Sequence, residues 1–283
     1  MNPTRLESYE AYSTRRHLVK KASPKMVLFL PRCCCSLIVA MGLLAGGTQA
    51  QTPVDPVGER GRWADMQRQF YRDGEVTFDP RVRVDVPGNA EDAMNVPVAV
   101  DARALAAEEI DRIVVVADYN PILKVLEFEP GVAAPYLAFR MKVQQTTPIR
   151  AGVRLKDGRW RVGSAVVASQ GGGCTAPSTG RSVAGWERTL NSVSARQFES
   201  TAGNRLRFSI LHPMDTGLAN GIPAFFIDEL SIRDAEGRVV ARIWPAEPVS
   251  ENPVFTLELG GVSRVTQIEG RDNNGNKVLG ALR

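Results

Sequence analysis

Short segments in which apolar and polar residues alternate are the feature that most constrains this chain. Apolar side chains occupy every second position in residues 82–86, 137–143, 151–156, 205–210 and 255–259. Such alternation has the period of a β-strand with one face toward a core and the other toward water. Asp157-Gly158 indicates a tight hairpin turn after one of these segments. The pattern predicts antiparallel sheets packed as β-sandwiches rather than a parallel sheet.

Two segments depart from the strand pattern. Trp63, Met66 and Phe70 lie at helical spacing, which predicts a short amphipathic helix over residues 63–72. Residues 102–111 are also interpreted as a helix. Everything else with a regular period is predicted to be strand.

Residues 170–182 interrupt the strand pattern and divide the chain. They are rich in Gly, Ser and Thr and have no apolar period. We therefore predict an all-β fold with one sandwich over residues 76–169, a second over residues 183–283, and residues 170–182 as the linker. Residues 51–75 are predicted to be a leader that contains the short helix.

The first 50 residues are predicted to be an export signal. Residues 36–45 form an apolar run that is too short to span a bilayer, and small residues follow it up to Ala50, near which we expect cleavage. Arg15 and Arg16 lie in a segment that resembles the twin-arginine export signal. A start at Met26 with general secretory export is the alternative. Both predict a periplasmic mature protein with no membrane segment left after the signal is removed.

Removal of this segment changes the composition. The chain has 35 Lys and Arg and 31 Asp and Glu, of which seven and two lie in the first 50 residues, so the remainder carries 28 and 29 and a net charge of −1. That balance gives no basic face for nucleic acid. Cys174 and His212 are the only cysteine and histidine left, which is too few for a His/Cys metal site or an internal disulfide. We expect no metal and no cofactor.

The remaining cysteine follows three glycines. Gly171, Gly172 and Gly173 lack the Cβ atom that restricts the backbone, so they predict a flexible arm that exposes Cys174. An exposed thiol outside the cytoplasm is a liability unless the protein uses it. Because no Lys, Arg or His is adjacent in sequence to activate it, the thiol suits a carrier better than a catalyst. The alternative is an incidental linker cysteine.

Both halves resemble the sulfur-oxidation carrier families. Residues 76–174, with Asp118-Tyr119-Asn120-Pro121 and the terminal Gly-Gly-Cys, resemble SoxY, whose cysteine holds the sulfur substrate covalently. His212-Pro213-Met214-Asp215-Thr216-Gly217, the segment 221–227 with Pro223, and residues 245–253 resemble SoxZ, the binding partner of SoxY. The chain is thus similar to fused SoxYZ-like carriers associated with quinoprotein dehydrogenases.

The resemblance implies two immunoglobulin-like sandwiches that pair within the chain. It implies a non-enzymatic carrier with Cys174 as its covalent site and with partner enzymes that load and process the adduct, among them a quinoprotein (PQQ) alcohol or methanol dehydrogenase or a cytochrome. In SoxY the cysteine lies near a free C-terminus, whereas Cys174 is followed by a whole second half. This difference weakens the expectation of ordinary thiosulfate oxidation, which stays an alternative.

The SoxZ-like motif is predicted to serve contact rather than catalysis. In the matched motif, His212, Pro213, Met214, Asp215, Gly217 and Pro223 are interpreted as partner or interface residues. His212 has no Gly-x-Ser-x-Gly nucleophile elbow to serve, and Asp215 is either its hydrogen-bond acceptor or a residue that stabilises a turn. A structural adaptor that docks to a dehydrogenase or cytochrome, with an incidental thiol, is the alternative to the carrier. A thiol-redox enzyme ranks last, because it lacks a resolving cysteine.

Overall fold

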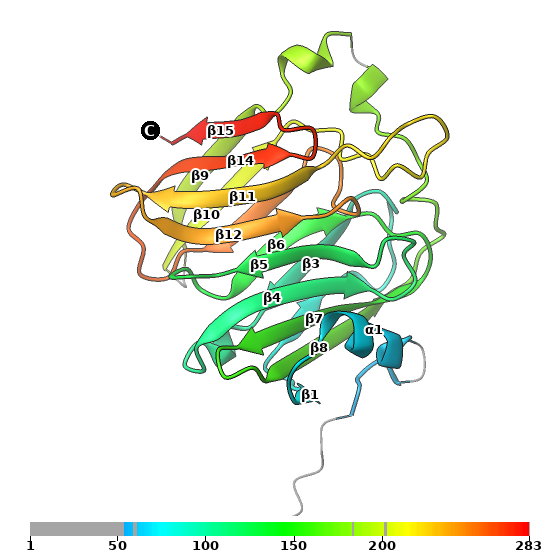
Figure 1. The fold of residues 1–283 in the computed structure, drawn as a ribbon, viewed down its shortest axis with the longest axis vertical. Coiled ribbons are helices and arrows are strands. Elements are labelled where there is room, and N and C mark those ends of the chain that lie inside the picture. The colour runs from blue at the N-terminus through cyan, green and yellow to red at the C-terminus, as the bar shows by residue number, and fades with distance from the viewer. Residues whose placement is uncertain (1–53, 59–60, 183, 201–202, 283) are drawn as a thin grey trace, which may run out of the picture. The chain divides into compact units, whose positions relative to one another are not determined.

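The structure, a computed structural model, describes residues 54–58, 61–182, 184–200 and 203–282. One α-helix and fifteen strands make up most of the described chain, with three short 3-10 turns at Arg103–Leu105, Gly180–Ser182 and Trp186–Arg188 (Figure 1). In chain order they are α1 (Trp63–Phe70), β1 (Val76–Phe78), β2 (Arg83–Asp85), β3 (Val96–Asp101), β4 (Ile110–Ala117), β5 (Lys124–Glu129), β6 (Tyr136–Met141), β7 (Thr147–Leu155), β8 (Trp160–Val167), β9 (Val193–Ser200), β10 (Gly203–Ile210), β11 (Ile227–Asp234), β12 (Val239–Pro245), β13 (Val254–Glu258), β14 (Val265–Asp272) and β15 (Lys277–Ala281).

The strands form two sheets, and each sheet contains strands from both halves of the chain. The larger sheet has nine strands in the order β1-β8-β7-β4-β5-β12-β11-β14-β15, and the smaller has six in the order β2-β3-β6-β13-β10-β9. The halves meet where β5 pairs antiparallel with β12 (Figure 1). In the smaller sheet they meet where β6 pairs antiparallel with β13. The predicted all-β fold of two immunoglobulin-like sandwiches is confirmed, and continuous strand pairing joins them in addition to the linker.

The segments with alternating apolar residues form strands with one buried face, as their period predicts. On β6, Leu137, Phe139 and Met141 are buried, while Ala138 and Arg140 between them are not. Most buried apolar side chains of the two sheets belong to one cluster that spans both halves. The predicted hairpin joins β7 to β8, where Gly158 has a positive φ of 89°.

The helix predicted over 63–72 is confirmed as α1. Its Met66 is fully buried, and with Tyr71 it packs against Val114 and Trp160 on the outer face of the nine-stranded sheet. The leader before it is held as well, because Asp55 forms an ion pair with Arg150.

The helix predicted over residues 102–111 is wrong. A single 3-10 turn occupies Arg103–Leu105, and β4 begins at Ile110. The Asp101 carboxylate accepts the backbone N–H of Arg103 and so favours one turn, whereas the β-branched residues of β4 pair with β5 and β7 along their length. Tertiary pairing therefore overrides the local helical pattern.

The predicted export signal, residues 1–50, lies outside the described residues. Within the part of the chain that the structure describes, no helix is both long enough and apolar enough to cross a membrane.

Candidate functional site

The glycine arm is docked along the end of β6. After β8, the backbone N–H groups of Gly172 and Gly173 donate to the carbonyls of Gln144 (3.1 Å) and Val143 (3.0 Å). The N–H of Cys174 donates to the side-chain oxygen of Gln144 at 3.2 Å. These bonds continue the pairing of the first half through the segment predicted to be a free linker.

The expectation of an exposed thiol is wrong, because Cys174 is 1% exposed. The glycines permit close packing here. A Cβ atom at Gly173 would lie 2.1 Å from the carbonyl oxygen of Ala93, and one at Gly171 would lie 2.5 Å from that of Gln144, where φ is also +94°. The same residues that predict a flexible arm let the backbone approach the sandwich closely. The neighbours of Cys174 at Gly172 and Thr175 are exposed, so the thiol is buried within a surface segment.

A buried lysine accompanies the buried thiol. The Cys174 Sγ lies 3.7 Å from the carbonyl oxygen of Lys142. Burial raises the pKa of the thiol to about 11, although the Lys142 ammonium acts in the opposite direction. The thiol is therefore protonated at neutral pH and is a poor nucleophile while the arm is docked.

Sequence reasoning missed Lys142, because alternation places it on the polar side of its segment. In the structure Lys142 is 1% exposed, and its ammonium group donates to the carbonyl of Met214 and, at 3.5 Å, to that of Glu247. Burial lowers the pKa of Lys142 to about 8, against the opposing charge of Asp215 above all. This cation of the first half is held by carbonyls of the second half.

Asn120 fixes the strand end that carries Lys142. Its amide nitrogen donates to the Lys142 carbonyl at 2.9 Å, and its amide oxygen accepts the Gln144 N–H at 2.9 Å. Asn120 belongs to the Asp118-Tyr119-Asn120-Pro121 segment that the sequence singled out. Its role is to position the backbone on which the cysteine arm docks.

Two carboxylates of the second half clamp the arm after the cysteine. The Asp215 carboxylate accepts the Ser178 N–H at 3.1 Å and forms an ion pair with Arg181. The Glu251 carboxylate accepts the N–H of Thr179 at 2.8 Å. Thr216 adds a third contact, since its hydroxyl donates to the Cys174 carbonyl at 2.6 Å. Two of the three SoxZ-like segments, 212–217 and 245–253, therefore contact the arm within the same chain.

His212 is buried beside Asp272 rather than Asp215. Its Nδ1 accepts the Met214 N–H at 3.0 Å, and its Nε2 faces the Asp272 carboxylate at 3.6 Å, which is too long for a hydrogen bond. Burial lowers the pKa of His212 to about 4 against the opposing charge of Asp272, so the ring is neutral at pH 7. The possibility that Asp215 serves as its acceptor is wrong, because Asp215 is engaged by the arm.

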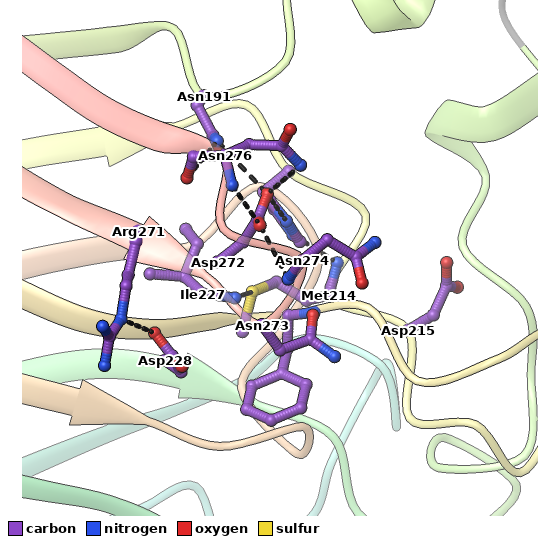
Figure 2. Close-up of polar contacts among 12 residues, drawn as sticks. Asn191, Met214, Asp215, Ile227, Asp228, Arg271, Asp272, Asn273, Asn274 and Asn276 are labelled. Atoms are coloured by element: carbon purple, nitrogen blue, oxygen red, sulfur yellow. Dashed lines mark hydrogen bonds and ion pairs between the residues drawn. The ribbon is translucent and has the colours of Figure 1, made fainter.

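Asp272 organises a polar turn around this histidine. Its carboxylate accepts the N–H groups of Asn274 (3.0 Å) and Asn276 (2.9 Å) and the side-chain amide of Asn191 (3.3 Å). Figure 2 shows this network, with Asp215 apart from it. Met214 links the network to β11, because its sulfur accepts the Ile227 N–H at 3.3 Å. These contacts give His212 a structural position.

The predicted motif residues divide into two groups. Pro213, Met214 and Asp215 are buried beneath or beside the arm, whereas Gly217 and Pro223 are exposed on the following loop. Among the described residues no group of three or more His, Cys, Asp or Glu side chains could hold a metal ion. What the buried group can do is shelter a protonated thiol.

Two family models match the chain. The model described as sulfur oxidation protein SoxY matches residues 67–174, and the one described as sulphur oxidation protein SoxZ matches residues 196–281. The first match ends at Cys174. No curated protein matches the chain.

Two solved structures show weak likeness to the chain. The sulfur carrier protein SoxY from Chlorobium limicola f thiosulfatophilum is 17% identical, with a TM-score of 0.33 over 38% of this chain and 96% of that one. A putative membrane anchored protein from Corynebacterium diphtheriae is 11% identical, with a TM-score of 0.22 over 75% of this chain and 57% of that one. Both TM-scores are low.

Proposed function

Because this chain belongs to the SoxY and SoxZ families of sulfur-oxidation proteins, fused in one polypeptide, we propose that it is a carrier whose Cys174 holds a sulfur-containing or other thiol-reactive group for partner enzymes. The observation that carries the proposal is the docking of the Cys174 arm. The arm pairs with the SoxY-like half through Val143 and Gln144 and is clamped by Asp215 of the SoxZ-like half.

Docking divides the carrier cycle into two states. In the docked state the thiol is buried and protonated, so it neither oxidises readily nor reacts with stray electrophiles. In the released state it reaches a partner enzyme. Joining Cys174 to a second thiol releases two protons and two electrons, so an oxidising partner accepts them; exchange with an existing disulfide-type donor needs no net oxidant. The partner enzyme carries out the chemistry, and the carrier determines when the thiol is accessible.

The place and partners of this carrier are part of the proposal. The predicted signal over residues 1–50, with Arg15 and Arg16 in a segment that resembles a twin-arginine signal, supports periplasmic export, in which one signal would serve both fused halves. The likeness to fused SoxYZ-like carriers supports a quinoprotein dehydrogenase system, with the dehydrogenase or its cytochrome as partner. Because Cys174 is internal, it can be presented as a loop but not inserted as a chain end, which makes thiosulfate oxidation the alternative cargo chemistry.

A structural adaptor is the second candidate, and the burial of Cys174 is the observation that favours it. In that case the fused sandwiches dock to a dehydrogenase or cytochrome, and the thiol is an ordinary core residue. The carrier requires the sulfur atom of Cys174 to form a covalent adduct, whereas the adaptor does not.

Intact-mass spectrometry of the chain purified from its native compartment separates these candidates. The carrier predicts an added mass on Cys174 that a reductant removes and that Cys174→Ser lacks. Cys174→Ala serves as the matched control, because it keeps the arm buried and apolar. If no reducible adduct is ever found, and both variants sustain growth that depends on the partner dehydrogenase, the adaptor replaces the carrier.

A further inference from the structure

The outer face of the six-stranded sheet carries three exposed arginines. Arg196 on β9 and Arg207 on β10 lie directly opposite each other in the antiparallel register. Arg140 lies on β6, with β13 between it and β10. Within the described part of the chain none of these three side chains forms an ion pair. Arg140, Arg196 and Arg207, with the small residues between them, form a surface that we call the arginine face.

Other arginines on the same sheet are neutralised by neighbours. Arg205 on β10 pairs with Glu258 on β13, and Arg83 on β2 pairs with Asp101 on β3. These pairs lie one register row away from Arg207, so carboxylates are available on this sheet in general. On the arginine face one carboxylate, Asp85 on β2, lines the same cavity as Arg140 and Arg207, and within the described residues it forms no ion pair with them, so the positive charges are in excess.

Small side chains leave a hollow between the arginines. Arg140 and Arg207 line an open cavity of about 410 Å³ that Ala99, Ala138 and Thr256 also line. Register places these three small residues in the same row as Arg207. Phe198, which is 39% exposed, lies on the same face in the next row, opposite Arg205.

The outer face of the nine-stranded sheet is different. α1 covers its first half, where Met66 packs against Trp160. Its arginines have partners, as in the pair of Arg233 with Glu269. No described element covers the arginine face in a comparable way, so its charges and its hollow stay open to a partner.

We propose that the arginine face docks a carboxylate-rich surface of a partner protein. Charge complementarity identifies the partner, because three guanidinium groups that form no ion pair outnumber the one carboxylate, Asp85, and present forked donors that match carboxylates. The hollow between Arg140 and Arg207 admits a side chain from the partner, and exposed Phe198 adds apolar surface on the same face of the sheet. The proposal does not depend on what Cys174 carries.

The register of Arg196 and Arg207 carries a cost that docking relieves. Like charges directly opposite on one face of an antiparallel pair destabilise it. A bound carboxylate between the two side chains turns this repulsion into attraction. Arg196 and Arg207 therefore lower the stability of the free protein and would stabilise a complex, which is a trade-off between stability and function.

Fluorescence anisotropy of a labelled decaglutamate peptide with the full chain tests the charge complementarity. We expect binding at about 0.05 M salt that weakens at least about tenfold at 0.3 M. The double variant Arg140→Glu, Arg207→Glu should weaken binding at low salt at least about tenfold. Failure of the unmodified chain to bind the peptide overturns the proposal.

A matched control separates the face from net charge. Arg72 and Arg264 are also exposed and form no ion pair within the described residues, but they lie off this sheet. The variant Arg72→Glu, Arg264→Glu changes the net charge equally and should weaken binding less than about twofold. Equal loss in both variants shows binding to overall charge and contradicts a docking face.

Thermal unfolding gives a readout that needs no ligand. Arg207→Thr removes the repulsion with Arg196 and places a strand-favouring residue on β10, so we expect the midpoint to rise by about 1–2 °C. A fall in the midpoint shows that the arginines support the fold, which contradicts their assignment to a partner.

Discussion

Two buried cations, Lys142 after β6 and Arg150 on β7, differ in how they are neutralised. Arg150 forms an ion pair with Asp118 at 2.9 Å and with Asp55 at 2.8 Å, and its guanidinium lies 5.1 Å from the centre of the Trp63 ring. Among the described residues, Lys142 donates only to carbonyl oxygens. Burial alone would lower the pKa of Arg150, yet Asp118 and Asp55 raise it above its usual value, whereas the pKa of Lys142 falls to about 8.

The difference separates a cluster that holds the fold together from one that lies under the cysteine arm. Asp118 and Asp55 lock Arg150 and with it the leader onto the large sheet, so this cluster serves the fold. Lys142 stands beside the Cys174 thiol and is held by the second half of the chain. A buried charge without an ion-pair partner is costly, so Lys142 beneath the docked arm is held at a cost that Arg150 does not carry.

Breaking the locked pair should have the largest effect. Asp118→Ala leaves a buried guanidinium with Asp55 alone and should reduce the free energy of unfolding by about 3–5 kcal/mol, measured by urea denaturation. The double variant Asp118→Leu, Arg150→Met removes both charges, so its free energy of unfolding should fall much less. If the single variant is as stable as the parent chain, Arg150 is not locked as described.

Undocking the arm should have the next largest effect, and glycine substitution is the sharpest way to do it. Gly173→Ala places a Cβ 2.1 Å from the Ala93 carbonyl oxygen, so we expect release of the arm and a loss of about 2 kcal/mol, with Cys174 becoming reactive. Gly172→Ala is the matched control, since its Cβ meets no atom within 4 Å and only the positive φ of 88° costs about 1 kcal/mol. Equal thiol reactivity in the two variants contradicts docking through close packing.

Titration of Lys142 should produce a smaller, pH-dependent effect. Its pKa is about 8 in the folded chain against 10.5 when unfolded, so the folded chain loses the proton first and stability rises with pH from 8 upward. Cys174, with a pKa of about 11 against 9.0, contributes the opposite slope from pH 9 upward and offsets the further gain. Between pH 8 and 9 we expect a gain of up to about 1 kcal/mol.

Lys142→Met should abolish that gain, because Met fills the same volume without a charge. Lys156→Met is the control, since Lys156 is an exposed lysine with a surface ion pair to Glu109. Urea denaturation at the two pH values measures both. A gain that survives in Lys142→Met assigns the pH dependence to another group.

The strands could be predicted from the sequence because alternation is local. Leu137, Phe139 and Met141 reveal the inner face of β6 without knowledge of any other strand. The local pattern could not show that residues 102–111 are not a helix, because their structure depends on the pairing of β4 with its neighbouring strands. The strand pairing between β5 and β12, which merges the halves, also has no local signature.

The candidate site shows the same limit. The sequence singled out Cys174, its glycines and the motif around Asp215, but it placed them in different domains with different roles. Burial of Cys174 depends on contacts with Gln144 and Thr216, which are distant in sequence. Lys142 was missed because alternation assigns it to the polar side, and only the approach of the second half buries it.

The rate at which iodoacetamide alkylates Cys174 in the folded full chain tests most directly whether the thiol is sheltered until its arm is released. The rate is followed on the Cys174 peptide by mass spectrometry and compared with the chain unfolded in urea at the same pH. The rise in pKa from 9.0 to about 11 alone predicts alkylation about 100-fold slower in the folded chain, and burial slows it further. Equal rates in the folded and unfolded chain would contradict a sheltered thiol.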